Sequence, residues 1–136
     1  MKRSVCYLAL ILALLLAGCG CTLRPTATAP VTVVKITVRY DGTTPHTQRQ
    51  YVSSEKIRAI LNYLRWIDPY GKPGKDPETI PGGLYRITLH LSDGSQSVYL
   101  QKADQYMKID EQPWQTIDTK KALTLGKLLA EMESDI

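Results

Sequence analysis

The sequence contains no Phe, and all three of its cysteines lie within the first 21 of its 136 residues. The rest of the chain can form no internal disulfide, so its fold must depend on a hydrophobic core. Its two histidines, His46 and His90, lack the spacing of a metal-binding motif. A Gly-x-Ser-x-Gly motif and a phosphate-binding glycine-rich loop are also missing. We therefore expect no catalytic residues, no cofactor and no metal site.

The composition is that of an ordinary small domain. Hydrophobic residues make up 43% of the chain and charged residues 22%, and both values are common in soluble proteins. They exclude a disordered charged tail, a collagen-like chain and a multi-span membrane protein. The length suits one domain and leaves little room for two.

The N-terminus has the layout of an export signal. Lys2 and Arg3 give it a positive start, and the stretch from Tyr7 to Ala17 is almost wholly Leu, Ile and Ala. This apolar run is too short to cross a bilayer, which takes about 20 residues. Its length and charged start are typical of a signal peptide. The run ends in Leu16-Ala17-Gly18-Cys19.

The four residues Leu16-Ala17-Gly18-Cys19 resemble the lipobox of bacterial lipoproteins. The resemblance covers about the first 20 residues and implies that the signal is cut before Cys19. It also implies that the Cys19 sulfur receives a diacylglycerol and that the freed amine is acylated. Two or more acyl chains hold a protein stably at a membrane. The alternative is a plain secretory signal with a chance cysteine.

The resemblance divides the chain into three parts. Residues 1–18 are the expected signal peptide, residues 19–30 the lipidated N-terminus and tether, and residues 31–136 a single domain. Residue Gly20 stands where Asp tends to retain such proteins at the inner membrane, so the resemblance favours the outer membrane of the bacterial envelope. The role of Cys21 stays open between an unused thiol and a pairing with another chain.

Charge is unevenly distributed along the chain. Residues 24–75 carry nine Lys and Arg against three Asp and Glu, whereas residues 76–136 carry six against ten. We expect no nucleic-acid partner, because the chain is exported and has no dense basic run. The basic half could face anionic lipid or an acidic partner. It could equally be a mixed, solvated surface.

Residue patterns predict an α+β fold in the order β-α-β-β-β(-β)-α, with about four antiparallel strands and two helices packed on one face. Residues 31–40 alternate as a half-buried strand, residues 43–50 form a polar loop, and Ser53 or Ser54 caps a helix that ends near Ile67. A hairpin follows over residues 84–100, turning at Asp93-Gly94. Shorter strands are expected at residues 106–110 and 114–117, and a helix after Asp118 or Thr119. The two-residue turn would pair Leu89 with Val98 and Ile87 with Leu100.

Two regions carry candidate partner-binding residues. Arg58 and Arg65 lie together on one side of the predicted helix 54–67. Tyr70 and Ile80 are available as anchors in residues 68–83, a stretch with four Pro and four Gly that has no regular period. Loops of this length are functional or mobile insertions. A third surface is the outward side of the strands, with Lys35, Arg39, Arg86, Thr88, His90 and Tyr99.

Three functions from different classes follow. The leading hypothesis is a non-enzymatic, membrane-anchored lipoprotein that binds a protein partner in the envelope. The second is a small envelope hydrolase that uses His46 or His90 with carboxylates. The third is a lipid- or ligand-carrying module with a cavity between the sheet and helix 54–67.

Overall fold

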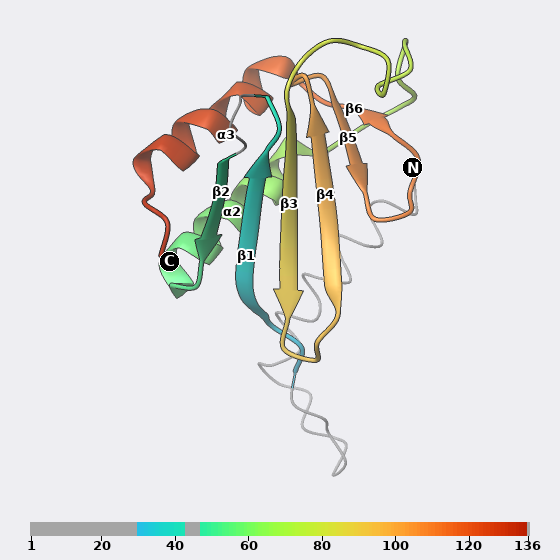
Figure 1. Cartoon of the computed structure of the whole chain (residues 1–136). Coiled ribbons are helices and arrows are strands. Elements are labelled where there is room, and N and C mark those ends of the chain that lie inside the picture. Colours follow the sequence, from blue (N-terminus) through green and yellow to red (C-terminus); the bar gives the residue numbers. More distant parts are fainter. Residues whose placement is uncertain (1–29, 43–46, 136) are drawn as a thin grey trace.

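The computed structural model describes residues 30–42 and 47–135. These residues form one antiparallel sheet of six strands in the order β2-β1-β3-β4-β5-β6, with two helices (Figure 1). The α+β class is confirmed, with more strands than the four expected. Its elements are β1 (Val33–Tyr40), β2 (Thr47–Tyr51), α2 (Ser54–Ile67), β3 (Leu84–Leu91), β4 (Gln96–Lys102), β5 (Tyr106–Ile109), β6 (Gln115–Thr116) and α3 (Thr119–Glu131).

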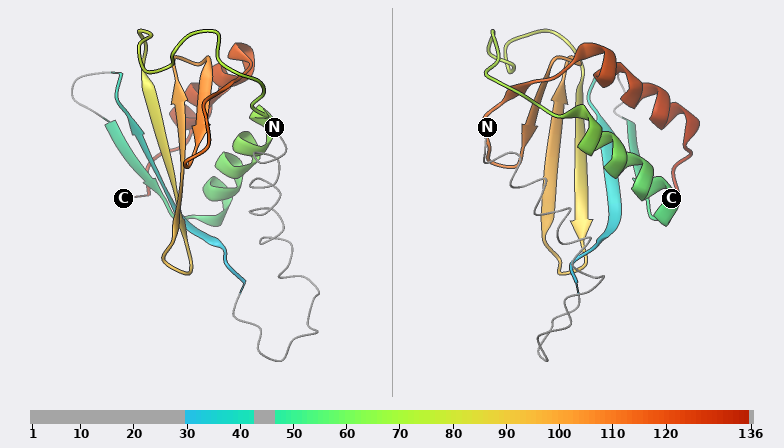
Figure 2. Two further views of the ribbon diagram at one scale, coloured as in Figure 1. Left: turned by 90° about the vertical axis from the view of Figure 1, so that its right-hand side faces the viewer. Right: turned by 180° about the vertical axis from the view of Figure 1, so that it is seen from behind.

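The core lies between the sheet and the helices. Helix α2 lies against one face of the sheet (Figure 2) and buries its apolar stripe there, as the helical spacing predicts. Helix α3 adds buried residues to the same core, at the end of the sheet where Tyr85 lies close to Gly126. The buried helical residues are Ile57, Ile60, Tyr63, Leu64, Ile67, Ala122, Leu125 and Leu129.

The expected register of the β3–β4 hairpin is wrong by one residue. Leu89 pairs with Ser97 and Ile87 with Tyr99, because the loop holds three residues and Gly94 takes a left-handed conformation in it. A shift of one residue moves every side chain of a strand to the other face. Tyr99 is therefore buried and not outward-facing. Leu100 takes the outward position instead.

Residues 43–50 are not wholly a loop, because β2 begins at Thr47. Strand β2 is the edge strand beside β1. It was not predicted because its sequence is polar and shows no alternation of apolar residues. Arg49 explains why a polar residue fits the inner side of this strand. Its guanidinium donates hydrogen bonds to the backbone carbonyls of Leu129, at 2.5 Å, and Met132, at 3.2 Å. The edge strand is thereby tied to the last turn of α3.

The residues just before α2 are bound by the C-terminal segment. Ser53 occupies the N-cap position, but its side chain makes no capping hydrogen bond. The carboxylate of Asp135 accepts hydrogen bonds from the backbone amides of Val52 and Ser53 at 2.7 and 2.9 Å, and from the Lys56 ammonium at 2.6 Å. These donors hold the pKa of Asp135 well below its usual range, with the Lys56 hydrogen bond as the largest cause.

A polar network sits inside the core. Gln101 is fully buried. Its carbonyl oxygen accepts a hydrogen bond from the Tyr63 hydroxyl, and its amide donates to the carboxylate of Asp104 and the carbonyl of Ala122 at 3.1 and 3.2 Å. Burial raises the pKa of Tyr63 well above its usual value. The network joins α2, β4 and α3 through one side chain.

Candidate functional site

An open groove of about 450 Å³ runs along one side of α2. Arg58 and Arg65, both predicted as partner-binding residues, line it together. They lie on the same side of the helix because the two positions are seven residues, or about two helical turns, apart. We call this feature the α2 groove; its lining is Val33, Val34, Val52, Ser54, Ile57, Arg58, Leu61, Asn62 and Arg65.

The apolar part of the α2 groove comes from a bulge at the start of β1. Val33 pairs with Leu91 and Lys35 with His90, so Val34 is the extra residue. A bulge redirects the side chains beside it. Val34 is 49% exposed, and Val52, from the segment before α2, is 47% exposed. The bulge therefore separates Val34 from the buried side chains of β1 and leaves it exposed in the groove, where Val52 is also exposed.

The charged part of the α2 groove is positive. Arg65 donates a hydrogen bond to the Asn62 side-chain oxygen at 2.8 Å, which orients its guanidinium along the helix. Arg58 is exposed one turn from Leu61. The groove lining contains two arginines and no acidic residue. The groove thus combines apolar contact with attraction for a negatively charged group.

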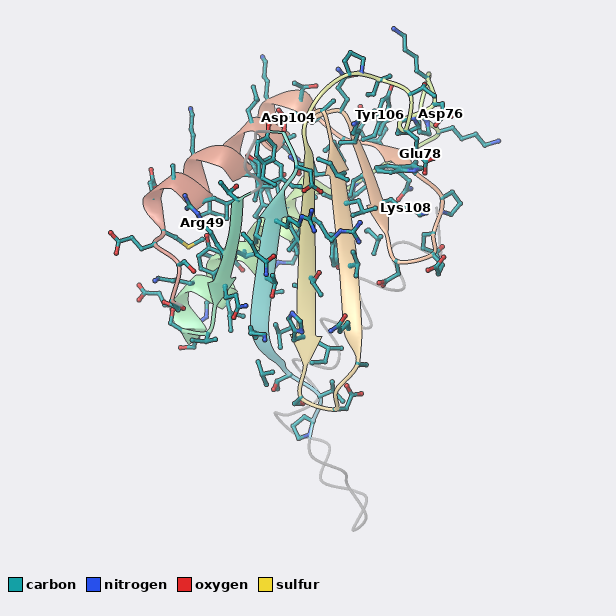
Figure 3. The ribbon with its side chains drawn as sticks, in the orientation of Figure 1. Arg49, Asp76, Glu78, Asp104, Tyr106 and Lys108 are labelled. Atoms are coloured by element: carbon teal, nitrogen blue, oxygen red, sulfur yellow. The ribbon has the colours of Figure 1, made fainter. Side chains whose placement is uncertain are left out.

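The second candidate surface is the face of the sheet opposite α2, which we call the open face. No helix of the described residues covers it (Figure 2). Successive side chains along a strand point to opposite faces of the sheet. Val38 and Ile87 are paired and buried, so the residues next to them in each strand point to the open face. Arg39 and Arg86 are directly opposite each other on this face. Leu100 is opposite Arg86 on the next strand, and Lys108 is opposite Leu100, so the four residues form a row across the sheet. Lys108 lies on β5 in Figure 3.

This row places like charges next to each other. Opposed like charges across a strand pair are unfavourable. The Arg39 guanidinium also contacts Asp41 at 2.8 Å, which offsets part of the repulsion. Arg86 is exposed. Lys35 and Lys102 occupy other outward positions of the open face.

His90 lies on the open face, directly opposite Lys35 of β1. Its Nε2 is 2.9 Å from the Thr37 hydroxyl and its Nδ1 is 3.3 Å from the Gln96 amide nitrogen. Partial burial, and secondarily the charge of Lys35, lower its pKa. The imidazole is therefore in contact with side chains of both neighbouring strands, β1 and β4. His46, the other histidine of the hydrolase hypothesis, lies outside the described residues.

Tyr70 and Ile80 do not join the α2 groove. Tyr70 is 56% exposed and exchanges two backbone hydrogen bonds with Thr116, each of 2.9 Å. It lines a separate hollow of about 460 Å³ together with Tyr106 and Lys120. Ile80 follows the turn that Asp76 organises by accepting from the Glu78 amide at 3.0 Å; Asp76 and Glu78 mark this loop in Figure 3. The structure therefore brings two of the four predicted residues together.

Neither a metal centre nor a spanning helix is found in the part of the chain that the structure describes. No three of its His, Cys, Asp and Glu side chains are grouped to hold a metal ion. Neither of its helices is both long and apolar enough to cross a membrane. Residues 1–29, with Cys19 and most of the expected signal and tether, lie outside the described residues.

No protein-family model, no curated protein and no solved structure matches this chain. Function is therefore inferred from the described side chains. Sequence reasoning found the two arginines of the α2 groove because helical spacing is regular. It missed Val33, Val34 and Val52, because no pattern in the sequence marks the bulge.

Proposed function

We propose that this protein is a bacterial lipoprotein, held at the envelope membrane by lipid on Cys19, whose open face binds an acidic protein partner without catalysis. The lipobox and the preceding signal support the anchor, and Gly20 favours the outer membrane. The observation that carries the binding role is the direct opposition of Arg39 and Arg86 on an uncovered sheet face.

The charge arrangement supports this role on energetic grounds. Placing two guanidinium groups opposite each other costs free energy that a sheet surface avoids by alternating charge signs. Carboxylates of a partner would relieve the repulsion, since arginine binds carboxylates through paired hydrogen bonds. Lys108 in the same row and Lys102 beside it extend the positive surface across β4 and β5.

The anchor is tested by the intact mass of the membrane-extracted protein. A chain that begins at Cys19 and carries a lipid-sized addition supports the anchor, provided that the addition is absent from Cys19→Ala. An unmodified or uncleaved chain refutes it. Extraction with detergent keeps the protein in the form in which the cell makes it.

The binding role is tested by crosslinked pull-down from envelope extract. We expect Arg86→Glu with Lys108→Glu to lose the captured partner, because both substitutions reverse charge on the open face. The matched control is Lys75→Glu with Lys127→Glu, which makes the same change in net charge at two exposed positions elsewhere. Equal loss from both pairs would show a response to net charge alone and would refute the assignment to the open face.

A further inference from the structure

The α2 groove lies at the end of the domain where the tether joins the sheet. The chain enters β1 at the end that carries the β3–β4 turn (Figure 1). Two hydrogen bonds fix this junction: the Ser92 amide donates to the Thr32 carbonyl at 2.8 Å, and the Thr32 amide donates to the Ser92 hydroxyl at 3.0 Å. Val33 and Val34, which line the groove, follow at once. The groove is therefore held close to Pro30, the last residue of the tether.

The length of the tether limits how far the groove can be from the anchor. Eleven residues, Gly20 to Pro30, follow Cys19 before the domain begins. Fully extended, they reach at most about 36 Å. The groove begins at Val33, three residues further along the chain, so its near end stays within roughly 46 Å of the membrane that holds Cys19.

The chemistry of the α2 groove matches a phospholipid surface with negative charge. Exposed Val34 and Val52 offer apolar contact, and Arg58 and Arg65 offer cations at its side. Lipids present the same pair of features, an apolar chain region next to an anionic headgroup. Basic residues close to such a surface are attracted to it within about a Debye length.

We propose that the α2 groove docks on the surface of an anionic phospholipid bilayer, the same bilayer that holds the Cys19 lipid. This inference rests on the anchor proposed above. Docking orients the domain, with the start of β1 and the side of α2 against the lipid. Each arginine contributes about fivefold to the ratio of docked to undocked protein, so neutralising both lowers that ratio by roughly 30-fold.

The test places a fluorescent reporter in the groove of the lipidated, full-length processed protein. Cys21→Ser removes the remaining free thiol, and Val34→Cys carries an environment-sensitive fluorophore; Val52→Cys serves as a second groove position in case the first disturbs the bulge. Thr79→Cys, on the exposed loop before β3, is the distant control. The protein is reconstituted into vesicles of phosphatidylcholine with phosphatidylglycerol, or of phosphatidylcholine alone, that contain lipids brominated on their chains.

We expect strong quenching of both groove reporters in the phosphatidylglycerol vesicles and little quenching of the Thr79 reporter. Arg58→Gln with Arg65→Gln should abolish most of the difference, whereas Lys75→Gln with Lys127→Gln should leave it unchanged. Quenching that is equal in the two vesicle types, or equal at groove and loop positions, overturns the proposal.

The same samples separate the anchor from the groove. Intact mass reports whether Cys19 carries lipid, and quenching reports whether the groove meets lipid, so either can fail alone. A fluorophore shift that appears in detergent as protein concentration rises, with no quenching in vesicles, assigns the groove to a second copy of the chain and overturns membrane docking.

Discussion

The neighbours Leu100 and Gln101 test which side of β4 faces the core. Gln101 is fully buried and Leu100 lies on the open face, although a hydrophobicity pattern alone would assign them the other way round. Gln101→Ala removes the acceptor of the buried Tyr63 hydroxyl and the donor to the Ala122 carbonyl. Leu100→Gln changes a partly exposed side chain that has solvent on one side.

The two substitutions should therefore differ strongly in cost. A buried hydroxyl left without a partner costs about 1–3 kcal/mol, and the cavity left by the shortened side chain adds to that cost. We expect Gln101→Ala to lower the free energy of unfolding by about 3 kcal/mol. Leu100→Gln should lower it by less than about 1 kcal/mol, as is usual for substitutions outside the core.

Urea unfolding followed by circular dichroism measures both values on the processed chain. The slope of the transition should stay the same in both variants, because neither changes the surface exposed on unfolding by much. If Leu100→Gln proves the costlier change, Leu100 faces the core, the hairpin closes on a two-residue turn, and the polar network around Gln101 does not form.

Three further predictions concern the edges of the core. Arg49→Ala removes the guanidinium that holds two carbonyls at the end of α3, so it should cost about 1–2 kcal/mol and speed amide exchange in the last turn of that helix; unchanged exchange would contradict the capping role. Gly83→Ala should lower the melting temperature by several degrees, because a Cβ there would stand 2.3 Å from the Tyr40 hydroxyl oxygen. The control is Gly74→Ala, which should be neutral because a Cβ at Gly74 meets nothing within 4 Å. Asp135 has a pKa held below its usual range, so its stabilisation is complete above the unfolded value of about 3.9 and is lost as the pH falls further. Asp135→Asn should flatten the pH dependence of the urea midpoint below that value, and a variant that keeps the full dependence would refute the assignment.

The long, strongly periodic elements were predictable. Residues 54–67 show apolar positions at helical spacing, and α2 has the same bounds. The alternation in residues 31–40 predicted a strand, and β1 spans Val33–Tyr40. Asp118 caps α3 by accepting from the amides of Lys120 and Lys121. In each case the local preference and the buried face agree, so no distant contact was needed to decide the structure.

The elements that failed depend on contacts distant in sequence. Strand β2 has a polar sequence and is stabilised by pairing with β1 and by the bonds of Arg49 to α3. Which side chains of β4 face the core depends on whether the hairpin loop holds two or three residues. The dipeptide Asp93-Gly94 is compatible with both loop lengths. Ser53 or Ser54 was expected to cap α2, but Ser53, at the N-cap position, makes no such bond. Asp135, 82 residues after Ser53, instead accepts from the amides of Val52 and Ser53 just before the helix.

The candidate sites divide in the same way. The proximity of Arg58 and Arg65 follows from helix geometry and was predictable. The apolar half of the α2 groove depends on the bulge at Val34, which nothing in the sequence marks. Tyr70 and Ile80 were predicted from residues 68–83, which have no regular period. Residue type alone does not predict where such side chains lie in the fold.

The position of β1 in the sheet has a mechanical consequence for a chain held at its N-terminus. Strand β1 has a hydrogen-bonded neighbour on each side, β2 and β3, and it is the first strand after the proposed tether. A pull on the proposed tether would act along β1, while the bonds to its neighbours lie across the direction of pull. The load is then shared by many bonds at once, in shear, and cannot peel them one at a time as it would from an edge strand. The proposed tether would therefore pull on a strand that is bonded on both sides, and not on an edge strand.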